Sequence, residues 1–237
     1  MSQPSEIAER RAVYDPVPPL ENGDRLTRAE FERRYRAMPR LKKAELIEGV
    51  VYMPSPVRLR SHGLPHCDLI AWLGTYKART PGLLTGDNST VRLDLDNEPQ
   101  PDVLLLVDPA RGGQAAIDDD DYVAGAPELV AEVASSSASY DLGVKKNAFR
   151  RNGVREYVVW RVLDLEIDWF VLREGRYEEL SPDASGIYRS EVFPGLWLDA
   201  AAMVRGDLAR VLDTLQEGLA SPEHAALVER LGGAGPG

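Results

Sequence analysis

The hydrophobic positions along this chain change their spacing several times, and each change predicts a structural element. Apolar residues over 64–80 recur at helical spacing, and Pro81–Gly82 ends that pattern, so a helix is expected there. Over 89–96 apolar and polar residues alternate, which indicates a half-buried strand. The turn-forming residues 97–101 then predict an antiparallel hairpin between this strand and the next one.

Two short runs are apolar on both faces and predict strands in the core. Val103–Val107 is one such run, and 128–134 is the other. Each run carries a carboxylate. Asp102 stands at the head of the first, directly after Pro101, which cannot donate a ladder hydrogen bond. Glu132 lies inside the second. Buried carboxylates are rare unless they are paired or bind a metal, so both positions are candidates for chemistry.

The N-terminal part predicts an extended arm followed by small elements. Residues 1–25 are rich in Pro, Glu and Arg, which is typical of a poorly ordered segment. Thr27 followed by Glu30 is a capping box, so a short helix is expected before Pro39. Residues 44–53 alternate as a strand does, and Gly49 within them indicates a bulge or turn.

The second half of the chain predicts one helix, a meander and a helical end. A helix is expected over Asp141–Asn152, with Asp141 as its N-cap and Gly153 ending it. Four strands with meander spacing follow over 155–190. Residues 199–231 are predicted to be mostly helical. A mixed β-sheet flanked by helices, an α/β or α+β fold with an added antiparallel meander, accounts for this order.

Composition excludes several classes of protein. Cys67 is the one cysteine, so no internal disulfide can form, which suits a reducing cytoplasm. The apolar stretches are too short to cross a bilayer, and the N-terminus lacks the apolar region of a secretory signal. We therefore expect a cytoplasmic protein with no membrane partner. A net charge of -10 argues against an extensive binding surface for nucleic acid, although five basic residues lie between Lys145 and Arg155.

Asp102, Glu132 and Lys145 together form a candidate catalytic set. Two carboxylates on neighbouring strands can hold magnesium, which prefers oxygen ligands, and a nearby ammonium can orient water or neutralise charge on a phosphate. Taken singly, the three have plainer interpretations: a turn cap, an exposed strand residue, and a solvated lysine paired with Asp141. Lys145 and Lys146 lie on opposite flanks of the helix, and we expect Lys145 to face Glu132.

The motifs also resemble a known family. "PD" at 101–102, a carboxylate in the next strand and a lysine are similar to the PD-(D/E)XK nuclease superfamily. "AELIEG", "QPDVLLLV" and "GAPELVAEVASSSASYDLGVKKNAFRRNGVREYVVW" resemble the Uma-two family of bacterial endonucleases, over about residues 41–173. The lysine is missing from the strand, because Val133 and Ala134 follow Glu132. In the family it lies in D-x-x-x-K, which corresponds to Asp141 and Lys145 here.

This resemblance implies a restriction-endonuclease-like domain over 41–198, preceded by the arm and short helix of 1–40 and followed by a helical extension and tail over 199–237. It also implies a magnesium- or manganese-dependent endonuclease acting on DNA. Asp102 and Glu132 would hold the metal, with the backbone carbonyl of Val133 as a third ligand. His66 matches the family's histidine. Either Glu45 or Glu48 would approach the site.

Alternatives and partners complete these expectations. His62 and His66 have the spacing of zinc ligands but lack the glutamate of H-E-x-x-H. The alternative function is a non-enzymatic module that keeps the nuclease fold to bind protein or nucleic acid, which the net charge favours. A hydrolase of smaller phosphoesters is a third class.

A homodimer through the meander is expected, because two cuts in a duplex need two sites. The candidate DNA-binding residues are Lys146, Arg150, Arg151 and Arg155.

Overall fold

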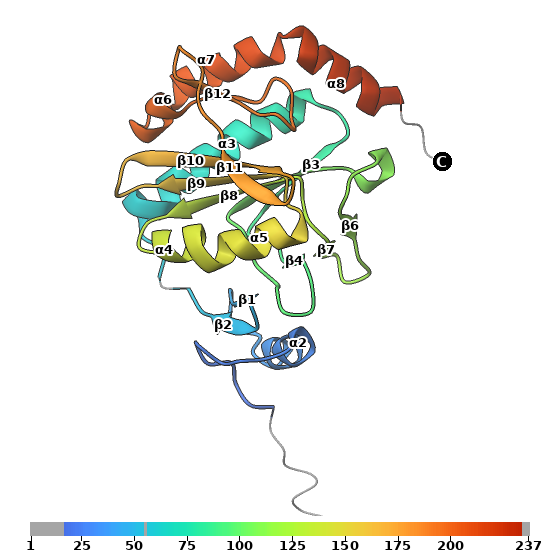
Figure 1. The fold of residues 1–237 in the computed structure, drawn as a ribbon. Coiled ribbons are helices and arrows are strands. Elements are labelled where there is room, and N and C mark those ends of the chain that lie inside the picture. Colours follow the sequence, from blue (N-terminus) through green and yellow to red (C-terminus); the bar gives the residue numbers. More distant parts are fainter. Residues whose placement is uncertain (1–16, 55, 234–237) are drawn as a thin grey trace, which may run out of the picture.

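The computed structural model describes residues 17–54 and 56–233, and its centre is a six-stranded sheet with helices on both faces (Figure 1). The strand order is β11-β10-β9-β8-β5-β3. Neighbouring strands are antiparallel except β8 and β9, which are parallel. The strands are β3 (Leu83–Asp87), β5 (Val103–Val107), β8 (Leu129–Ala134), β9 (Glu156–Arg161), β10 (Glu166–Arg173) and β11 (Arg176–Glu179).

Each face of this sheet has its own hydrophobic core. On one face Val103 and Leu105 pack with helix α3 (Leu64–Arg79) and the C-terminal helices. On the other, Leu104 and Leu106 pack with the helical segment between β8 and β9. Because successive strand residues point to opposite faces, a strand buried on both sides needs an unbroken apolar run. The predicted mixed sheet flanked by helices is confirmed. The C-terminal helices are α6 (Ala200–Val204), α7 (Leu208–Leu219) and α8 (Pro222–Gly233).

The helical segment between β8 and β9 makes the one parallel crossover of the described sheet. It consists of α4 (Ala138–Tyr140), a π-helical turn η3 (Asp141–Lys145) and α5 (Lys146–Asn152). Gly153 ends it in the left-handed conformation at φ 88°, as expected for a C-cap glycine. The expectation that Asp141 is the N-cap is wrong, because the helix already begins at Ala138 and Asp141 lies one turn inside it.

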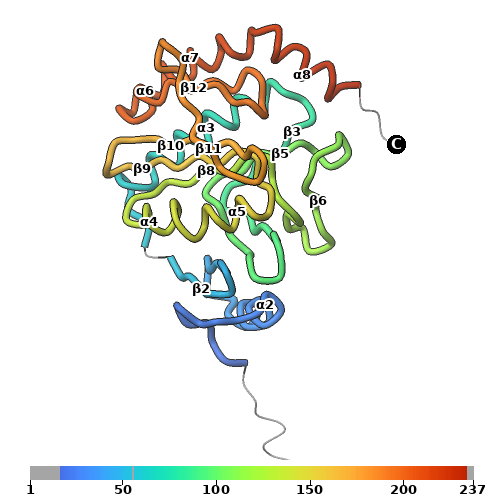
Figure 2. Tube along the Cα trace, viewed as in Figure 1, coloured from blue at the N-terminus to red at the C-terminus, as the bar shows by residue number. Residues whose placement is uncertain are grey.

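A small N-terminal module, residues 17–53, lies below the sheet (Figure 2). It contains α2 (Arg28–Arg36), capped by Thr27 as predicted, and the hairpin of β1 (Glu45–Ile47) and β2 (Val50–Tyr52). Both turn residues of the hairpin have positive φ, 53° at Glu48 and 72° at Gly49, as tight hairpins require. A separate cluster of buried side chains holds the module together: Leu20, Phe31, Ala44, Leu46 and Val51.

The described part of the predicted arm is packed rather than extended into solvent. Leu20 is 3% exposed, and the Gly23 amide donates to the Val51 carbonyl at 2.8 Å. The expectation of a poorly ordered segment is therefore wrong for residues 17–25, because Leu20 completes the module's core. Its remainder, residues 1–16, lies outside the described residues.

The hairpin expected between 89–96 and the next strand is also wrong. Only β4 (Val91–Arg92) is a strand there, and it pairs in parallel with β7 (Val123–Ala124), which in turn pairs with β6 (Ala116–Ile117). β5 instead pairs with β3 and β8. A strand that is apolar on both faces has to lie inside the sheet, and β5 does so between β3 and β8. The 89–96 segment leaves the strand conformation after Arg92, and its Leu95 is 73% exposed.

The predicted meander holds for three strands and fails for the fourth. β9, β10 and β11 are consecutive neighbours, as expected. β12 (Ile187–Arg189) pairs with β13 (Trp197–Asp199) in a separate small sheet. This hairpin covers the face of the sheet that carries α3. Leu198 is buried in the core of that face, and the Tyr188 ring stacks on the Trp169 ring with their centres 5.9 Å apart. Two short helical turns, η1 (Leu59–Gly63, π) and η2 (Pro109–Arg111, 3-10), complete the described elements.

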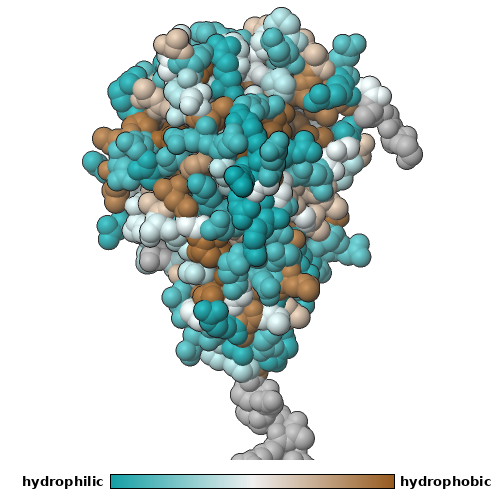
Figure 3. All heavy atoms as spheres, in the orientation of Figure 1, coloured by the Kyte–Doolittle hydropathy of each residue, from teal (hydrophilic) through white to brown (hydrophobic). Residues whose placement is uncertain are grey.

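A membrane-spanning helix must be long and apolar, and a docking patch gathers apolar residues on the surface. None of the described helices is both long and apolar enough to cross a bilayer. On the face shown in Figure 3, apolar residues are scattered among hydrophilic ones. Single exposed apolar residues are ordinary on folded proteins, so this face does not identify a partner. Homodimerisation through the meander stays a prediction.

The N-terminal module joins the rest of the chain through a charged cluster around Arg92. Its Nε lies 3.1 Å from Glu32 Oε1, and its Nη1 lies 2.6 Å from Asp118 Oδ2. Glu98 is buried beside them, 2% exposed, and its backbone pairs with Leu46 of β1. Burial, together with the neighbouring Glu32 carboxyl, raises the pKa of Glu98 to about 8. The joint is therefore built around a carboxyl that is protonated in the folded state at neutral pH.

This joint predicts a pH-dependent stability. A pKa of about 8 in the folded chain, against an ordinary 4.5, means that Glu98 stabilises the fold fully at low pH and loses that contribution as pH rises through 8. Glu98→Gln should therefore lose less unfolding free energy than the wild type between about pH 5 and about pH 9. Urea unfolding at several pH values measures this. Asp96→Asn, at an exposed neighbour, should behave as the wild type. Equal pH slopes for the wild type and Glu98→Gln would contradict the interpretation.

Candidate active site

The pairing of β5 with β8 sets Asp102 opposite Glu132. Val103 is the partner of Ala131 in this antiparallel pair, so the residues one step beyond each face one another. The Asp102 amide donates to Glu132 Oε2 at 3.3 Å, and the Val133 amide donates to Asp102 Oδ2 at 2.9 Å. Both carboxylates are buried, at 4% and 3% exposure. Two acids far apart in sequence thus share one end of the β5–β8 ladder.

Lys145 is the cation of this buried set. Its Nζ lies 2.7 Å from Glu132 Oε1 and 2.9 Å from Glu45 Oε1, and its side chain is 3% exposed. The next residue, Lys146, points elsewhere: its Nζ lies 3.4 Å from the centre of the Phe170 ring. The side chains of the two lysines therefore point to different sides of the helical segment, as predicted, and Lys145 faces Glu132. η3, the π-helical turn that ends at Lys145, is a rare element that is often found at functional sites.

The N-terminal module supplies Glu45 to the same set. Glu45 begins β1, and its Oε1 also accepts the Gln100 amide at 2.7 Å, next to the "PD" segment. Glu48 turns away and pairs with Arg151 at 2.6 Å. Of the two glutamates that the sequence left open, Glu45 is the one that lies in the site. Glu45 lies at the start of β1, whereas Glu48 lies in the turn after β1, so the two side chains have different surroundings.

A second group of polar side chains surrounds Asp102 on its less buried side. His62 Nε2 lies 3.3 Å from Asp102 Oδ2, and Lys43 Nζ lies 3.6 Å from Asp102 Oδ1. His66 Nε2 lies 2.9 Å from the Asp102 carbonyl oxygen and 3.0 Å from Asp87 Oδ1. Of these three side chains, the sequence predicts only His66 as a supporting residue, beside Glu45. His62 was weighed only as a zinc ligand, and Lys43 was missed, although it stands two residues before Glu45.

The charges of the site are strongly perturbed. Burial alone would raise the pKa of Asp102, but His62 and Lys43 hold it well below its usual range. Burial raises the pKa of Glu132 above its ordinary value, and the charge of Lys145 only partly offsets this. Burial disfavours the charged form of Lys145, yet Glu132 and Glu45 raise its pKa well above normal. Asp102 and Lys145 are therefore both ionised at neutral pH.

Asp141 adds a further buried acid to the site. It is 4% exposed, and burial raises its pKa above the ordinary value although Lys145 lies nearby. The Tyr157 hydroxyl donates to its backbone carbonyl at 3.1 Å. The negative charge of Asp141 helps to raise the pKa of Lys145. No ion pair at contact distance joins the two residues in the described structure.

The predicted DNA-binding cations do not converge on Asp102. Arg150 donates to the Gly175 carbonyl at 2.7 Å, in the turn between β10 and β11. Arg155 donates to Gln114 at 2.8 Å, and Arg151 is paired with Glu48. Lys146 lies over Phe170. These contacts spread over several elements of the fold, and a role in DNA binding stays a prediction for all four.

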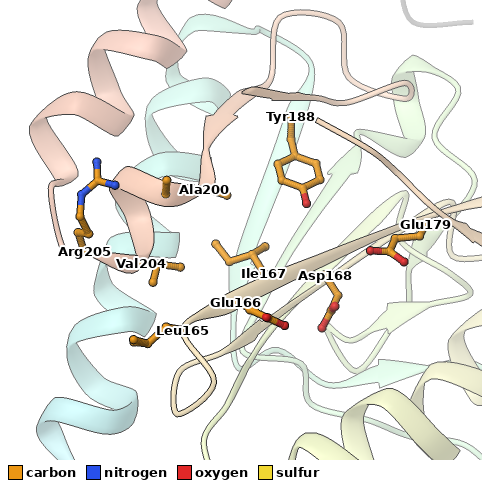
Figure 4. Close-up of a pocket in the computed structure, with 10 residues that line it drawn as sticks. Leu165, Glu166, Ile167, Asp168, Glu179, Tyr188, Ala200, Val204 and Arg205 are labelled. Carbon is orange, nitrogen blue, oxygen red and sulfur yellow. The ribbon is translucent and has the colours of Figure 1, made fainter. Parts of the chain in front are cut away.

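The side chains of this site do not form a preformed metal cage among the described residues. The described residues contain no group of three or more His, Cys, Asp or Glu side chains arranged to hold a metal ion. A hollow of about 530 Å³ lies away from the site, between the start of β10, β12 and α6 (Figure 4). Ile167 and Tyr188 line it, together with Arg205. The more exposed side chains at Asp102 are those of Lys43 and His62, at 22% and 23%.

Comparisons with known proteins give a family and a related structure. A family model described as "Uma2: Putative restriction endonuclease" matches residues 28–201. A crystal structure of a "putative nuclease belonging to DUF820" from Anabaena variabilis ATCC 29413 is 14% identical with a TM-score of 0.49, and the match covers 73% of this chain and 97% of that chain. No curated protein matches the chain.

The buried ion pairs predict that Lys145 is needed for stability. Lys145→Met keeps most of the side-chain volume but leaves Glu132 and Glu45 without their cation, which should lower the unfolding free energy by about 3 kcal/mol or more. Lys146→Met removes only a partly exposed cation above Phe170 and should cost about 1 kcal/mol or less. Urea unfolding near neutral pH compares them. Equal losses in the two variants would contradict the buried ion-pair description.

Proposed function

Because this chain belongs to the Uma2 family, whose description is "Putative restriction endonuclease", we propose that it is a nuclease that hydrolyses phosphodiester bonds of DNA with the help of magnesium or manganese. The observation that carries the proposal is the opposition of Asp102 and Glu132 across β5 and β8, with Lys145 2.7 Å from Glu132. Phosphodiester hydrolysis needs a way to activate water and to neutralise charge on the phosphate, and these groups have the chemistry for both.

The donor set fits magnesium as that ion is commonly bound. Magnesium takes one or two carboxylates and completes its shell with waters and substrate phosphates, so it does not need a full protein cage. Asp102 and Glu132 would be those carboxylates. The Val133 amide faces Asp102, and the N–H and C=O of one strand residue point to the same side, which supports the Val133 carbonyl as a third oxygen. Manganese accepts the same oxygen ligands.

The balance of charge also favours a divalent cation. Asp102, Glu132, Glu45 and Asp141 are four buried acids, while Lys145 is the one buried lysine among the described residues. A bound divalent ion would stabilise ionised Glu132, whose pKa is otherwise raised by burial. When bound, such a metal polarises the phosphate and lowers the pKa of a coordinated water.

The chain's own residues would then divide the remaining work. An ammonium has three donors, and two of those of Lys145 face Glu132 and Glu45, so the third is left to orient the attacking water. Glu45 fixes Lys145 in this position. His66 holds the Asp102 backbone and so positions its carboxylate. As water attacks phosphorus, a new P–O bond forms and the bond to the leaving oxygen breaks. The attacking water gives up a proton to solvent, and the leaving oxygen takes one from solvent to become a hydroxyl.

The alternative is a module that keeps the fold for binding and does not catalyse. Two observations favour it: the net charge of -10, and the pairing of Lys145 with two carboxylates, which already compensates part of the buried charge. A purified protein that binds DNA but never cuts it would match this alternative. A cleavage assay therefore separates the two functions.

Cleavage of supercoiled plasmid tests the proposed activity. The wild type should nick plasmid with magnesium or manganese and not with EDTA. Lys145→Ala and Asp102→Asn should each lower the rate by about two orders of magnitude or more, the scale for loss of a positioned catalytic group. Lys146→Ala is the matched control and should keep the rate at saturating DNA. If Lys146→Ala is the inactive variant, or if both lysine variants cleave normally, the proposed role of Lys145 is wrong.

Thermal unfolding tests the metal site without any need for activity. Magnesium or manganese that binds the folded chain should raise its melting temperature by linkage, increasingly with metal concentration. Asp102→Asn and Glu132→Gln should each abolish that increase. The Asp96→Asn variant, at an exposed acid, should respond as the wild type. A wild-type melting temperature that ignores both metals would count strongly against the site.

A further inference from the structure

The catalytic lysine cannot also be the main contact for a substrate phosphate. Lys145 is 3% exposed in its side chain and lies between Glu132 and Glu45, at 2.7 and 2.9 Å. The Tyr140 ring covers it further, 5.7 Å from Nζ to the ring centre. A phosphodiester that approaches the carboxylates from solvent therefore meets other side chains first. Those side chains lie around Asp102.

The two oxygens of Asp102 face different surroundings. Oδ2 is held by the Val133 amide at 2.9 Å and by His62 at 3.3 Å. Oδ1 faces Lys43, whose Nζ is 3.6 Å away, beyond the length of a good ammonium–carboxylate hydrogen bond. Oδ1 is thus the less engaged oxygen of the buried acid, and Lys43 is the cation beside it.

Lys43 has the exposure and the freedom that a substrate contact needs. Its side chain is 22% exposed, against 3% for Lys145. Its hydrogen bond goes to the Asn88 side chain at 2.8 Å, so the ammonium is anchored by a neutral partner. Two of its three donors remain for other ligands. Lysine is a common phosphate ligand because its compact charge needs no fixed geometry.

The same short segment delivers both the inner and the outer groups. Glu45, which binds Lys145, and Lys43, which faces Asp102, are separated only by Ala44. Ala44 is fully buried in the core of the N-terminal module, which fixes this segment against the site. Lys42, on the other side of Lys43, is exposed to solvent and supplies a neighbouring charge for comparison.

We propose that Lys43 contacts a non-bridging oxygen of the phosphodiester that is to be cleaved, so that the N-terminal module is part of the substrate-binding site. This inference rests on the proposed function. It assigns substrate binding to the outer cation and leaves the buried Lys145 to orient water. Without such a cation the acids around the site would repel the phosphate, because like charges at this range oppose binding.

The test uses Lys43→Ala, Lys43→Arg and the control Lys42→Ala in the full chain. Fluorescence anisotropy with a labelled DNA duplex, with calcium replacing magnesium, gives Kd at several salt concentrations. Lys43→Ala should weaken binding about tenfold, as expected for loss of one charge-assisted hydrogen bond, and should reduce the salt slope by about one. Lys43→Arg should recover most of the affinity. Lys42→Ala should bind as the wild type.

Two further readouts separate a phosphate contact from a structural role. In steady-state cleavage, Lys43→Ala should raise KM more than it lowers kcat. Its melting temperature should still rise with manganese, because Lys43 is not a metal ligand. Lys43→Ala with unchanged Kd and salt slope would overturn the inference, and so would an equal loss of affinity in Lys42→Ala. A wild type that binds no duplex overturns it as well.

Failure of the proposed function would look different. A wild type that binds duplex but does not cleave it, with affinity lost only in Lys43→Ala, would remove the nuclease activity and leave the phosphate contact standing. A wild type that cleaves normally, with Lys43→Ala indistinguishable from it in Kd and KM, would keep the activity and remove the contact.

Discussion

The ammonium of Lys145 between Glu132 and Glu45 is the interaction on which the rest of the site depends. It joins three segments that are far apart in sequence: β1 of the N-terminal module, the core strand β8, and the π-helical turn before α5. All three groups are buried, so none can exchange its partner for water at low cost. Removing the lysine would leave two acids inside the protein. The position of each segment is therefore tied to the other two.

This constraint explains why the N-terminal module is more than an appendage. Its own core is small, built around Phe31, Leu46 and Val51. It is held to the larger domain by Glu45 on Lys145 and by the charged cluster around Arg92 and Glu98. A segment so attached can bring Lys43 beside Asp102 with little freedom. The module therefore places two charged side chains, Glu45 and Lys43, in the candidate site.

Burial divides the site into two layers of different exposure. The inner layer is Glu132, Lys145 and Glu45, whose charges compensate one another. The outer layer is Lys43 and the histidines His62 and His66, which contact Asp102 from its more open side. Charges that are already paired and dry are suited to holding geometry, while half-exposed ones can take a substrate or an ion. Asp102 connects the layers because its amide donates to Glu132 while its carboxylate lies beside Lys43 and His62.

The sequence by itself determined the elements whose signal is local. The unbroken apolar run of Val103–Val107 required a strand buried on both faces, and Gly153 required the end of a helix. The sequence also predicted that Asp102, Glu132 and Lys145 form one set, because buried carboxylates are rare, and the structure brings the three together. Only the tertiary structure decided which strands pair, so the expected hairpin of 89–96 with β5 was wrong. It alone decided that Glu45, rather than Glu48, meets Lys145, and that Lys43 and His62 reach Asp102. No local pattern relates these residues, since Glu45 and Lys43 reach the site from the N-terminal module and His62 from the turn before α3.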